Sequence, residues 1–194
     1  MRFRSILALG LVGALFWSCA SLPEPAPGKD TLVIAQPSFS ASGMPWTYVN
    51  GKTSNNVTVW LVNLDTKKVD SKVTNQSGFV TFVGLPAGRY LLGQIGVKIT
   101  ANNSTYTSSH RPEGPGYSFE VQAGKVTNLG QVDWKESYSK FEGGSAAGNT
   151  SSTTISAKDT VTLGDDYQGL RDLFAKTFAK SKWNDADWVS AEFQ

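Results

Sequence analysis

The amino-acid sequence predicts a mainly β protein, an antiparallel β-sandwich of seven to eight strands followed by a C-terminal amphipathic helix. Short runs of β-branched and aromatic residues, many alternating between apolar and polar side chains, predict the strands. Turn-forming Gly, Pro, Asn and Asp residues separate these runs at intervals of about 8–12 residues, which is typical of a two-layer sandwich. Helical spacing occurs in one stretch, close to the C-terminus.

The clearest strand prediction is residues 57–64, where apolar side chains occupy both faces. A strand of this kind is usually central in its sheet or packed between layers. Gly93 and Gly96 interrupt the predicted strand at residues 89–100, which indicates a bulge or a bend there. The other predicted strands are residues 31–36, which Pro37 ends, and residues 69–74, 79–83, 117–122 and 126–134, with Tyr106 in a polar strand or loop.

The predicted helix begins at Tyr167 and runs to about Trp183, with apolar side chains three and four residues apart. Asp165 and Asp166 precede it as candidate N-caps. An isolated helix of this length is marginal in water, so it is expected to dock on the sandwich, on a partner or on the membrane surface. Docking on the sandwich is favoured, with Trp183 and Trp188 at the end of the helix contributing to the contact.

Changes in composition divide the chain into five segments. Three prolines within residues 20–29 predict an extended, semi-rigid tether. Gly, Ala, Ser, Thr and Asn make up nearly all of residues 143–156, which predicts a flexible linker. The expected segments are a signal peptide at 1–18, a Pro-rich tether at 19–29, the sandwich at 30–140, the linker at 141–164, and the helix with its tail at 165–194.

The N-terminus is organised like a secretory signal. Arg2 and Arg4 precede an apolar run at residues 6–17, and Ser18 and Cys19 follow that run. The run is shorter than the roughly 20 apolar residues that a membrane-spanning helix needs. Cys19 is the only cysteine, so no intramolecular disulfide can form, and an unmodified thiol at this position would be a liability.

A signal that ends on cysteine resembles the bacterial lipoprotein pattern, in which the cysteine is acylated and becomes the new N-terminus. The usual motif has Leu three positions before the cysteine and a small residue two before it, whereas this chain has Phe16 and Trp17, and Ser18 alone fits. The resemblance implies lipidation of Cys19, for example with palmitate, and an extracytoplasmic protein held at the cell membrane or outer membrane. The alternative is an ordinary cleaved signal followed by an incidental cysteine.

Cleavage before Cys19 removes the net positive charge of the chain. The whole chain has 18 Lys and Arg residues against 16 Asp and Glu, and residues 1–18 contain two of the basic residues and none of the acidic ones. The mature chain is therefore neutral. Because nucleic-acid binding needs a basic face or stripe, nucleic acid is excluded as a partner. The membrane is expected as a partner through the N-terminal lipid alone.

Residues 74–92, TNQSGFVTFVGLPAGRYLL, carry a second resemblance. A turn ending in Gly78, an aromatic-alternating strand and a Leu-Pro-x-Gly-x-Tyr corner ending at Tyr90 are similar to prealbumin-like sandwiches. That group includes transthyretin-like, carboxypeptidase regulatory-like and collagen-adhesin B-type domains. The resemblance covers about residues 30–134 and implies the sandwich fold with a positive φ at Gly78, but it implies no particular activity because the pattern is largely structural.

Some adhesin domains of this group contain an internal Lys–Asn isopeptide bond beside a buried acid. Here the first predicted strand has no lysine, and residues 93–99 have no acidic side chain. Asn128 is the single match to that pattern, so no isopeptide bond is expected.

Patterns for catalysis and metal binding are largely missing. Gly51-Lys52-Thr53 looks like the end of a phosphate-binding loop, but Trp46 stands where that loop needs glycine, so a turn is expected. His110 is the only histidine and no G-x-S-x-G motif accompanies it, so a surface position is expected for it. One cysteine and one histidine exclude a zinc site built from those ligands. We therefore expect no enzyme activity, no cofactor and no metal.

Trp46 and Tyr48 are the remaining candidates for ligand contact, in the segment SASGMPWTYVNGK. Aromatic side chains in the loops of a sandwich bind sugars or protein partners, but they also cap its open end. The preferred hypothesis is a lipid-anchored cell-envelope protein whose sandwich is a non-catalytic binding or structural module, with an envelope protein or a glycan as partner. The alternative is a carbohydrate- or small-ligand-binding module that uses Trp46 and Tyr48, and an enzyme is the least favoured class.

Overall fold

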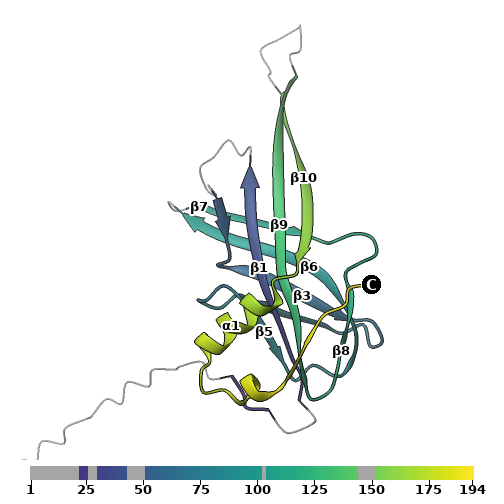
Figure 1. Cartoon of the computed structure of the whole chain (residues 1–194). Helices are drawn as coiled ribbons and strands as arrows, with labels where there is room; N and C mark the ends of the chain where they lie inside the picture. The colour runs from purple at the N-terminus through teal and green to yellow at the C-terminus, as the bar shows by residue number, and fades with distance from the viewer. Residues whose placement is uncertain (1–21, 26–29, 43–50, 102–103, 144–151) are drawn as a thin grey trace, which may run out of the picture.

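The structure, a computed structural model, describes residues 22–25, 30–42, 51–101, 104–143 and 152–194. These residues form two β-sheets packed face to face, with one α-helix against the outer face of the first sheet (Figure 1). The predicted mainly β fold with a helix near the C-terminus is confirmed. The predicted number of strands is wrong, because the described residues form eleven rather than seven to eight.

The strands are β1 (Leu32–Ser42), β2 (Gly51–Thr53), β3 (Val57–Asn63), β4 (Val69–Val73), β5 (Val80–Val83), β6 (Gly88–Ala101), β7 (Ser104–His110), β8 (Ser118–Val121), β9 (Lys125–Gly143), β10 (Ser152–Gly164) and β11 (Asp187–Ser190). The helices are α1 (Tyr167–Thr177) and the 3₁₀ helix η1 (Lys182–Asp185).

Sheet A is built around β1 and β9, which run parallel to each other. Its strand order is β10-β9-β1-β2, with β5 paired to the first residues of β1 and β11 to the first residues of β9. β11 is also parallel to β9, whereas β2, β5 and β10 pair antiparallel with their neighbours. Sheet A is therefore mixed, and the prediction of an antiparallel sandwich is wrong for this sheet. Parallel pairing joins strands that are far apart in sequence, so short-range patterns do not reveal it.

Sheet B is antiparallel in all its described pairs, with the order β4-β3-β6-β7 and with β8 paired to the first residues of β6. The predicted irregularity in β6 is present. The register against β3 shifts between Trp60 and Leu61, which leaves Gly93 as an extra residue on β6. A side-chain carbon at Gly93 would lie 2.6 Å from Val62, so glycine is the residue that fits this bulge.

The main apolar core fills the space between the two sheets. β3 buries every second side chain in this core and leaves the alternate ones half-exposed on the outer face of sheet B. At the corner before β6, the buried Tyr90 donates a hydrogen bond from its hydroxyl to the carbonyl of Pro86 at 2.9 Å. Gly78, in the turn before β5, has a φ of +81°, so the predicted turn conformation is confirmed.

A second apolar cluster lies between sheet A and the two helices. Asp166 caps α1 by accepting a hydrogen bond from the backbone of Gly169 at 2.9 Å. The expected docking of the helix on the sandwich is confirmed. α1 ends at Thr177 instead of near Trp183, because Phe178 leaves the helical conformation with φ −122° and ψ 54°. The buried members of this cluster are Leu32, Ile34, Phe79, Val126, Leu170, Phe174 and Trp183.

β1 continues through Pro37, which was expected to end it. On the edge facing away from β9, β1 pairs with β5 as far as Ala35 and with β2 from Phe39 onward. Proline is tolerated between them because, in the described part of the chain, no strand pairs with that edge at Pro37. A turn was expected at Gly51-Lys52-Thr53. These residues form the short strand β2 instead, so that prediction is wrong.

Much of the predicted linker at residues 141–164 is a strand. β10 pairs antiparallel with β9 from Ser152 to Gly164, and the two strands form a hairpin that extends beyond the rest of sheet A (Figure 1). Small polar residues indicated flexibility, but the Thr, Ile and Val residues among them also suit a strand that has a partner. The sheet therefore continues past the expected sandwich boundary at residue 140.

Candidate functional site

The residues singled out from the sequence for function lie outside the described residues. This applies to Cys19, the expected lipidation site, and to Trp46 and Tyr48, the expected ligand-binding aromatics. The described part of the chain presents three other regions of interest. They are a polar cluster between the sheets, a groove on sheet B, and the junction of the N-terminal segment with α1 and η1.

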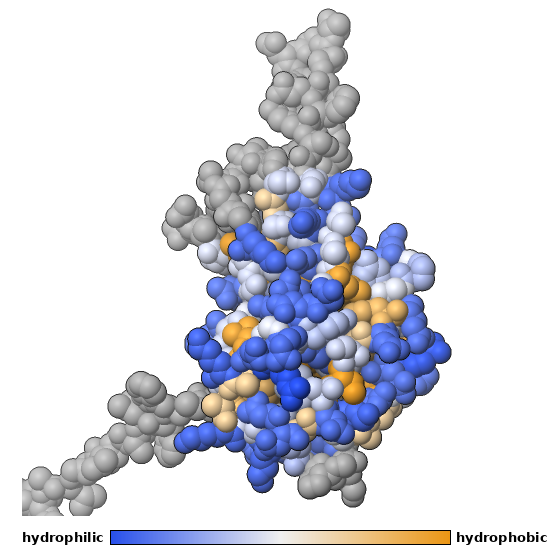
Figure 2. Space-filling view, in the orientation of Figure 1, coloured by the Kyte–Doolittle hydropathy of each residue, from blue (hydrophilic) through white to orange (hydrophobic). Residues whose placement is uncertain are grey.

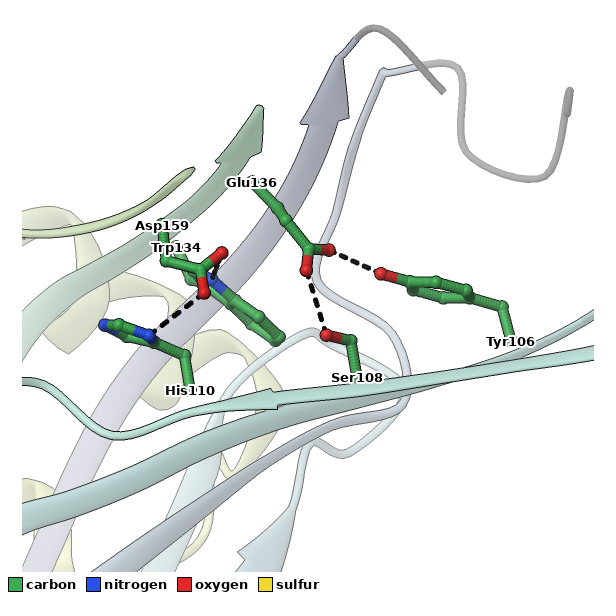
Figure 3. Close-up of polar contacts among 6 residues, drawn as sticks. All are labelled: Tyr106, Ser108, His110, Trp134, Glu136 and Asp159. Carbon is green, nitrogen blue, oxygen red and sulfur yellow. Dashed lines mark hydrogen bonds and ion pairs between the residues drawn. The ribbon is translucent and has the colours of Figure 1, made fainter. Parts of the chain in front are cut away.

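The polar cluster is centred on Glu136 of β9, whose side chain lies between the sheets in a residue that is 4% exposed. Tyr106 and Ser108 of β7 both donate hydrogen bonds to this carboxylate, and the bond from Ser108 is 3.0 Å long (Figure 3). Because each carboxylate oxygen accepts one of these bonds, part of the penalty for burying the charge is offset. The cluster joins sheet A to sheet B.

His110 lies at the other side of this cluster and pairs with Asp159 of β10 (Figure 3). The Nδ1 atom of His110 is 3.2 Å from Asp159 Oδ2, and Trp134 Nε1 donates to Oδ1 of the same carboxylate at 3.4 Å. The imidazole also stacks on Trp134, with 6.3 Å between ring centroids. His110 is half-buried, so the expectation of a simple surface histidine is wrong.

A histidine oriented by a carboxylate is the arrangement of a general base, but a hydrolase of this type also needs a nucleophile beside the imidazole. No hydroxyl among the described residues is hydrogen bonded to His110, and Ser108 donates to Glu136 instead. Within the described ranges, no group of three or more His, Cys, Asp or Glu side chains is placed to hold a metal ion. The geometry of the cluster is that of a brace between β7 and the strands β9 and β10.

Asp133 of β9 points to the other face of sheet A, since adjacent residues in a strand alternate. Lys52 Nζ lies 2.8 Å from its Oδ1 atom, and Ser38 donates to the same oxygen at 2.5 Å. Burial raises the pKa of Asp133, but the hydrogen bonds from Lys52 and Ser38 and the charges of Lys52 and Lys135 outweigh burial and hold that pKa below its ordinary value of 3.8. The contact ties β2, β1 and β9 together.

The second region is a groove of about 380 Å³ on the outer face of sheet B. The half-exposed Trp60 follows Thr58 on the same face. A side-chain carbon at Gly96 would lie 3.0 Å from the Trp60 indole, so the ring occupies the space above this glycine. Trp60 does not line the groove, but its ring lies over Gly96, which pairs with the lining residue Thr58. The hydroxyl, amide and ammonium groups of the lining suit a hydroxyl-bearing ligand. The groove is lined by Asn56, Thr58, Val73, Lys98 and Thr100.

The third region joins the two ends of the chain. Leu22 packs against the apolar cluster under α1. The carbonyl of Pro23 accepts a hydrogen bond from Trp183 Nε1 at 2.8 Å, and the Glu24 carboxylate accepts one from the backbone N–H of Lys182 at 3.0 Å. Part of the predicted tether is therefore held on the folded body. The prediction of an extended tether rests on composition, and composition does not reveal contacts between residues far apart in the sequence.

The surface gives two further observations. Figure 2 shows that the face over α1 and β10 is mainly hydrophilic, with apolar areas that are small and separate. Across the described residues, no helix has both the length and the apolar character needed to cross a membrane.

Sequence reasoning missed Glu136 and Trp60. Glu136 falls in the polar run after the predicted strand at 126–134, and the signal available was its alternation with Val132 and Trp134. Trp60 was assigned to a strand that is apolar on both faces, and the sequence does not say which face stays uncovered.

No protein-family model matches this chain, and no curated protein matches it. Among solved structures, a leucine-rich repeat protein from Bacteroides thetaiotaomicron is similar over 54% of this chain, with 20% sequence identity and a TM-score of 0.32. The chain spans 14% of that protein's length. A likeness at this level supports no inference about fold or function.

Proposed function

We propose that this protein is a lipid-anchored lipoprotein of the bacterial cell envelope, whose β-sandwich is a non-catalytic binding or structural module. Acylated Cys19 would hold it on the extracytoplasmic side of the cell membrane or outer membrane. The proposal includes membership of the prealbumin-like group, which the turn at Gly78 and the corner closed by Tyr90 support. His110 pairs with Asp159, and Glu136 accepts hydrogen bonds from Tyr106 and Ser108, which favours a non-catalytic module.

The observation that best supports this proposal is the junction of residues 22–24 with η1. These residues follow Cys19 almost directly, so an anchor there would act on the folded body without a long free tether. The β9–β10 hairpin extends from the opposite end of the molecule (Figure 1). A protein attached in this way keeps most of its sandwich accessible to partners.

The test is to express the full chain in a bacterium with labelled palmitate and to compare it with Cys19→Ser. The proposal predicts label in the wild-type protein, which fractionates with membranes, and no label in Cys19→Ser, which becomes soluble. A wild-type protein without label, or Cys19→Ser protein that still fractionates with membranes, would contradict the anchor.

A second candidate function is carbohydrate or small-ligand binding. Trp46 and Tyr48 were its predicted residues, and the groove beside Trp60 gives it a specific basis in the described structure. An aromatic ring binds the apolar face of a sugar, while the hydroxyl and amide groups of Thr58 and Asn56 suit sugar hydroxyls. Lys98 adds a positive charge, which favours acidic sugars.

Titration with neutral and uronate-containing oligosaccharides, followed by calorimetry, tests this second function. If the groove binds them, Trp60→Ala should weaken binding by about threefold to tenfold. Lys98→Gln should weaken binding of the uronates specifically, whereas the control Lys72→Gln, another exposed lysine of sheet B, should change nothing. Absence of binding, or a loss caused equally by Lys72→Gln, would contradict a sugar site in this groove.

A further inference from the structure

We infer that the end of the molecule formed by the C-terminus of α1 and by η1 is a lipid-contacting surface that binds anionic headgroups. This surface, the basic corner, consists of Lys176, Lys180 and Lys182. The inference rests on the proposed function, because it takes Cys19 as the point of attachment to the bilayer. It adds an orientation of the protein on the membrane and a partner for one face.

The first step is that the N-terminal segment is fixed to this end of the molecule. Pro23 is hydrogen bonded to the side chain of Trp183, a residue that is 1% exposed. Glu24 is hydrogen bonded to the backbone of Lys182, so a member of the basic corner contacts the segment directly. Leu22 packs on the same apolar cluster as α1.

The second step is the length of the chain between the anchor and this segment. Three residue steps separate Cys19 from Leu22. Even a fully extended chain spans at most about 3.6 Å per residue, so the two Cα atoms lie within about 11 Å of each other. An acyl group on Cys19 therefore keeps the segment that contacts η1 near the headgroups, and the upper limit of about 11 Å is of the same order as the Debye length of about 8 Å at physiological ionic strength.

The third step is the charge of the corner. All three lysines are exposed, and none lies within ion-pair distance of a carboxylate of the described residues. No Asp or Glu occurs between Asp172, one turn earlier on α1, and Asp185, at the far end of η1. The Glu24 carboxylate also lies at this corner, because it accepts a hydrogen bond from the backbone of Lys182, so the three lysines and Glu24 together carry a charge of about +2. A lysine near an anionic membrane surface strengthens binding by roughly fivefold.

The fourth step is the position of the rest of the molecule. The basic corner and the β9–β10 hairpin lie at opposite ends (Figure 1). With the corner on the headgroups, the hairpin points away from the bilayer. The lipid would then hold the protein at the bilayer and the charged surface would orient it there. For a protein held by only one acyl chain, a basic patch is also a typical second signal for membrane binding.

The experiment uses the single thiol of the chain. Protein from Cys19 onward, which contains every described residue, is coupled at Cys19 to a single-chain maleimide lipid, so that the assay does not depend on acylation in cells. Partitioning is measured on phosphatidylcholine vesicles with and without phosphatidylglycerol. The variant is Lys176→Gln with Lys180→Gln and Lys182→Gln. The matched control replaces three exposed lysines elsewhere, Lys72, Lys135 and Lys158.

We expect the unmodified sequence to prefer anionic vesicles by roughly 100-fold, as three lysines at about fivefold each imply. The basic-corner variant should lose most of this preference, and the control should keep it. High salt should remove the preference from the unmodified sequence and from the control. All proteins should unfold at the same urea concentration, because the replaced side chains are exposed. A preference that survives in the basic-corner variant, or that falls equally in the control, would overturn the inference. Failure of Cys19 to be acylated in cells would instead contradict the proposed function.

Discussion

Sheet A and sheet B share one apolar core, yet they differ in what covers their outer faces. The outer face of sheet A lies under α1 and η1 at the first residues of β1 and β9, and residues 32–35 of β1 are all fully buried as a result. Farther along the same face, Lys52 and Asp133 stay partly exposed. No described helix or strand packs on the outer face of sheet B, and β3 buries only alternate side chains. Sheet A is therefore the structural side of the molecule, and sheet B offers the accessible side.

The comparison also separates two ways of holding the fold. Sheet A is tied to its surroundings by the apolar cluster under α1, by the Glu136 brace and by the Lys52–Asp133 contact. Sheet B has a groove and exposed edge side chains such as Val73, which is 55% exposed. Substitutions on the two outer faces should consequently differ in their effect on stability, and this difference can be measured.

The largest expected effect comes from the cluster under α1. Phe174→Ala should lower the free energy of unfolding by about 3–5 kcal/mol, because Phe174 is fully buried and contacts Phe79, Phe178 and Trp188. Val73→Ala on sheet B should change it by about 0.5 kcal/mol or less. Urea unfolding of both variants checks this. Equal losses of unfolding free energy in the two variants would contradict the difference between the covered face of sheet A and the open face of sheet B.

The next effect concerns the brace between the sheets. Glu136→Ala should destabilise the fold by about 1–3 kcal/mol, because the Tyr106 and Ser108 hydroxyls lose a buried acceptor. A double-mutant cycle with Tyr106→Phe should give a coupling of at least about 0.5 kcal/mol. Glu120→Ala, at an exposed position of β8, serves as the control and should be neutral. Strict additivity of the two substitutions would show that the contact does not contribute.

Individual elements show which parts of the two sheets could be predicted from the sequence. The turn at Gly78, the bulge at Gly93 and the helix start at Asp166 depend on local sequence, and all three were predictable. The pairing of β1 with β9 and the strand β10 depend on partners far along the chain. Small polar residues in β10 resemble a linker until β9 supplies the partner strand.

The same reasoning applies to the candidate site. Lipidation of Cys19 is predicted from a local pattern, because the expected signal and its cysteine are contiguous in the sequence. The contacts of Pro23 and Glu24 with η1 join residues about 160 positions apart, so no window of the sequence contains both partners. The groove at Trp60 depended equally on knowing which face of sheet B is left open.

A smaller effect is expected at the junction of the two ends. Trp183→Phe removes the donor to the Pro23 carbonyl and should cost about 0.5–1.5 kcal/mol. The amide of Lys182, which donates to Glu24, should then exchange with solvent faster. Trp188→Phe is the matched control, since its indole donates to the carbonyl of Trp183 and not to the N-terminal segment. Equal exchange at Lys182 in both variants would argue against a fixed junction.

The smallest effect is a pH dependence from Asp133. Its lowered pKa means that the folded state favours the ionised carboxylate. The stabilisation is present above the unfolded-state pKa, near 3.8, and is lost as the pH falls through the lower folded-state pKa. Asp133→Asn should therefore lose less stability than the wild type between about pH 4 and pH 2. Unfolding free energies across that window, with Asp70→Asn as the control, check the assignment, and parallel curves for Asp133→Asn and the wild type would refute it.

We propose that Cys19 anchors this sandwich to a membrane by the end at which α1 and η1 lie. The most direct measurement is mass spectrometry of the N-terminal tryptic peptide from protein extracted from cells. Lys29 is the first basic residue after Cys19, so trypsin should release residues 19–29. We expect this peptide to begin at Cys19 and to carry acyl chains. A peptide that begins elsewhere, or one that carries an unmodified thiol, would contradict this proposal.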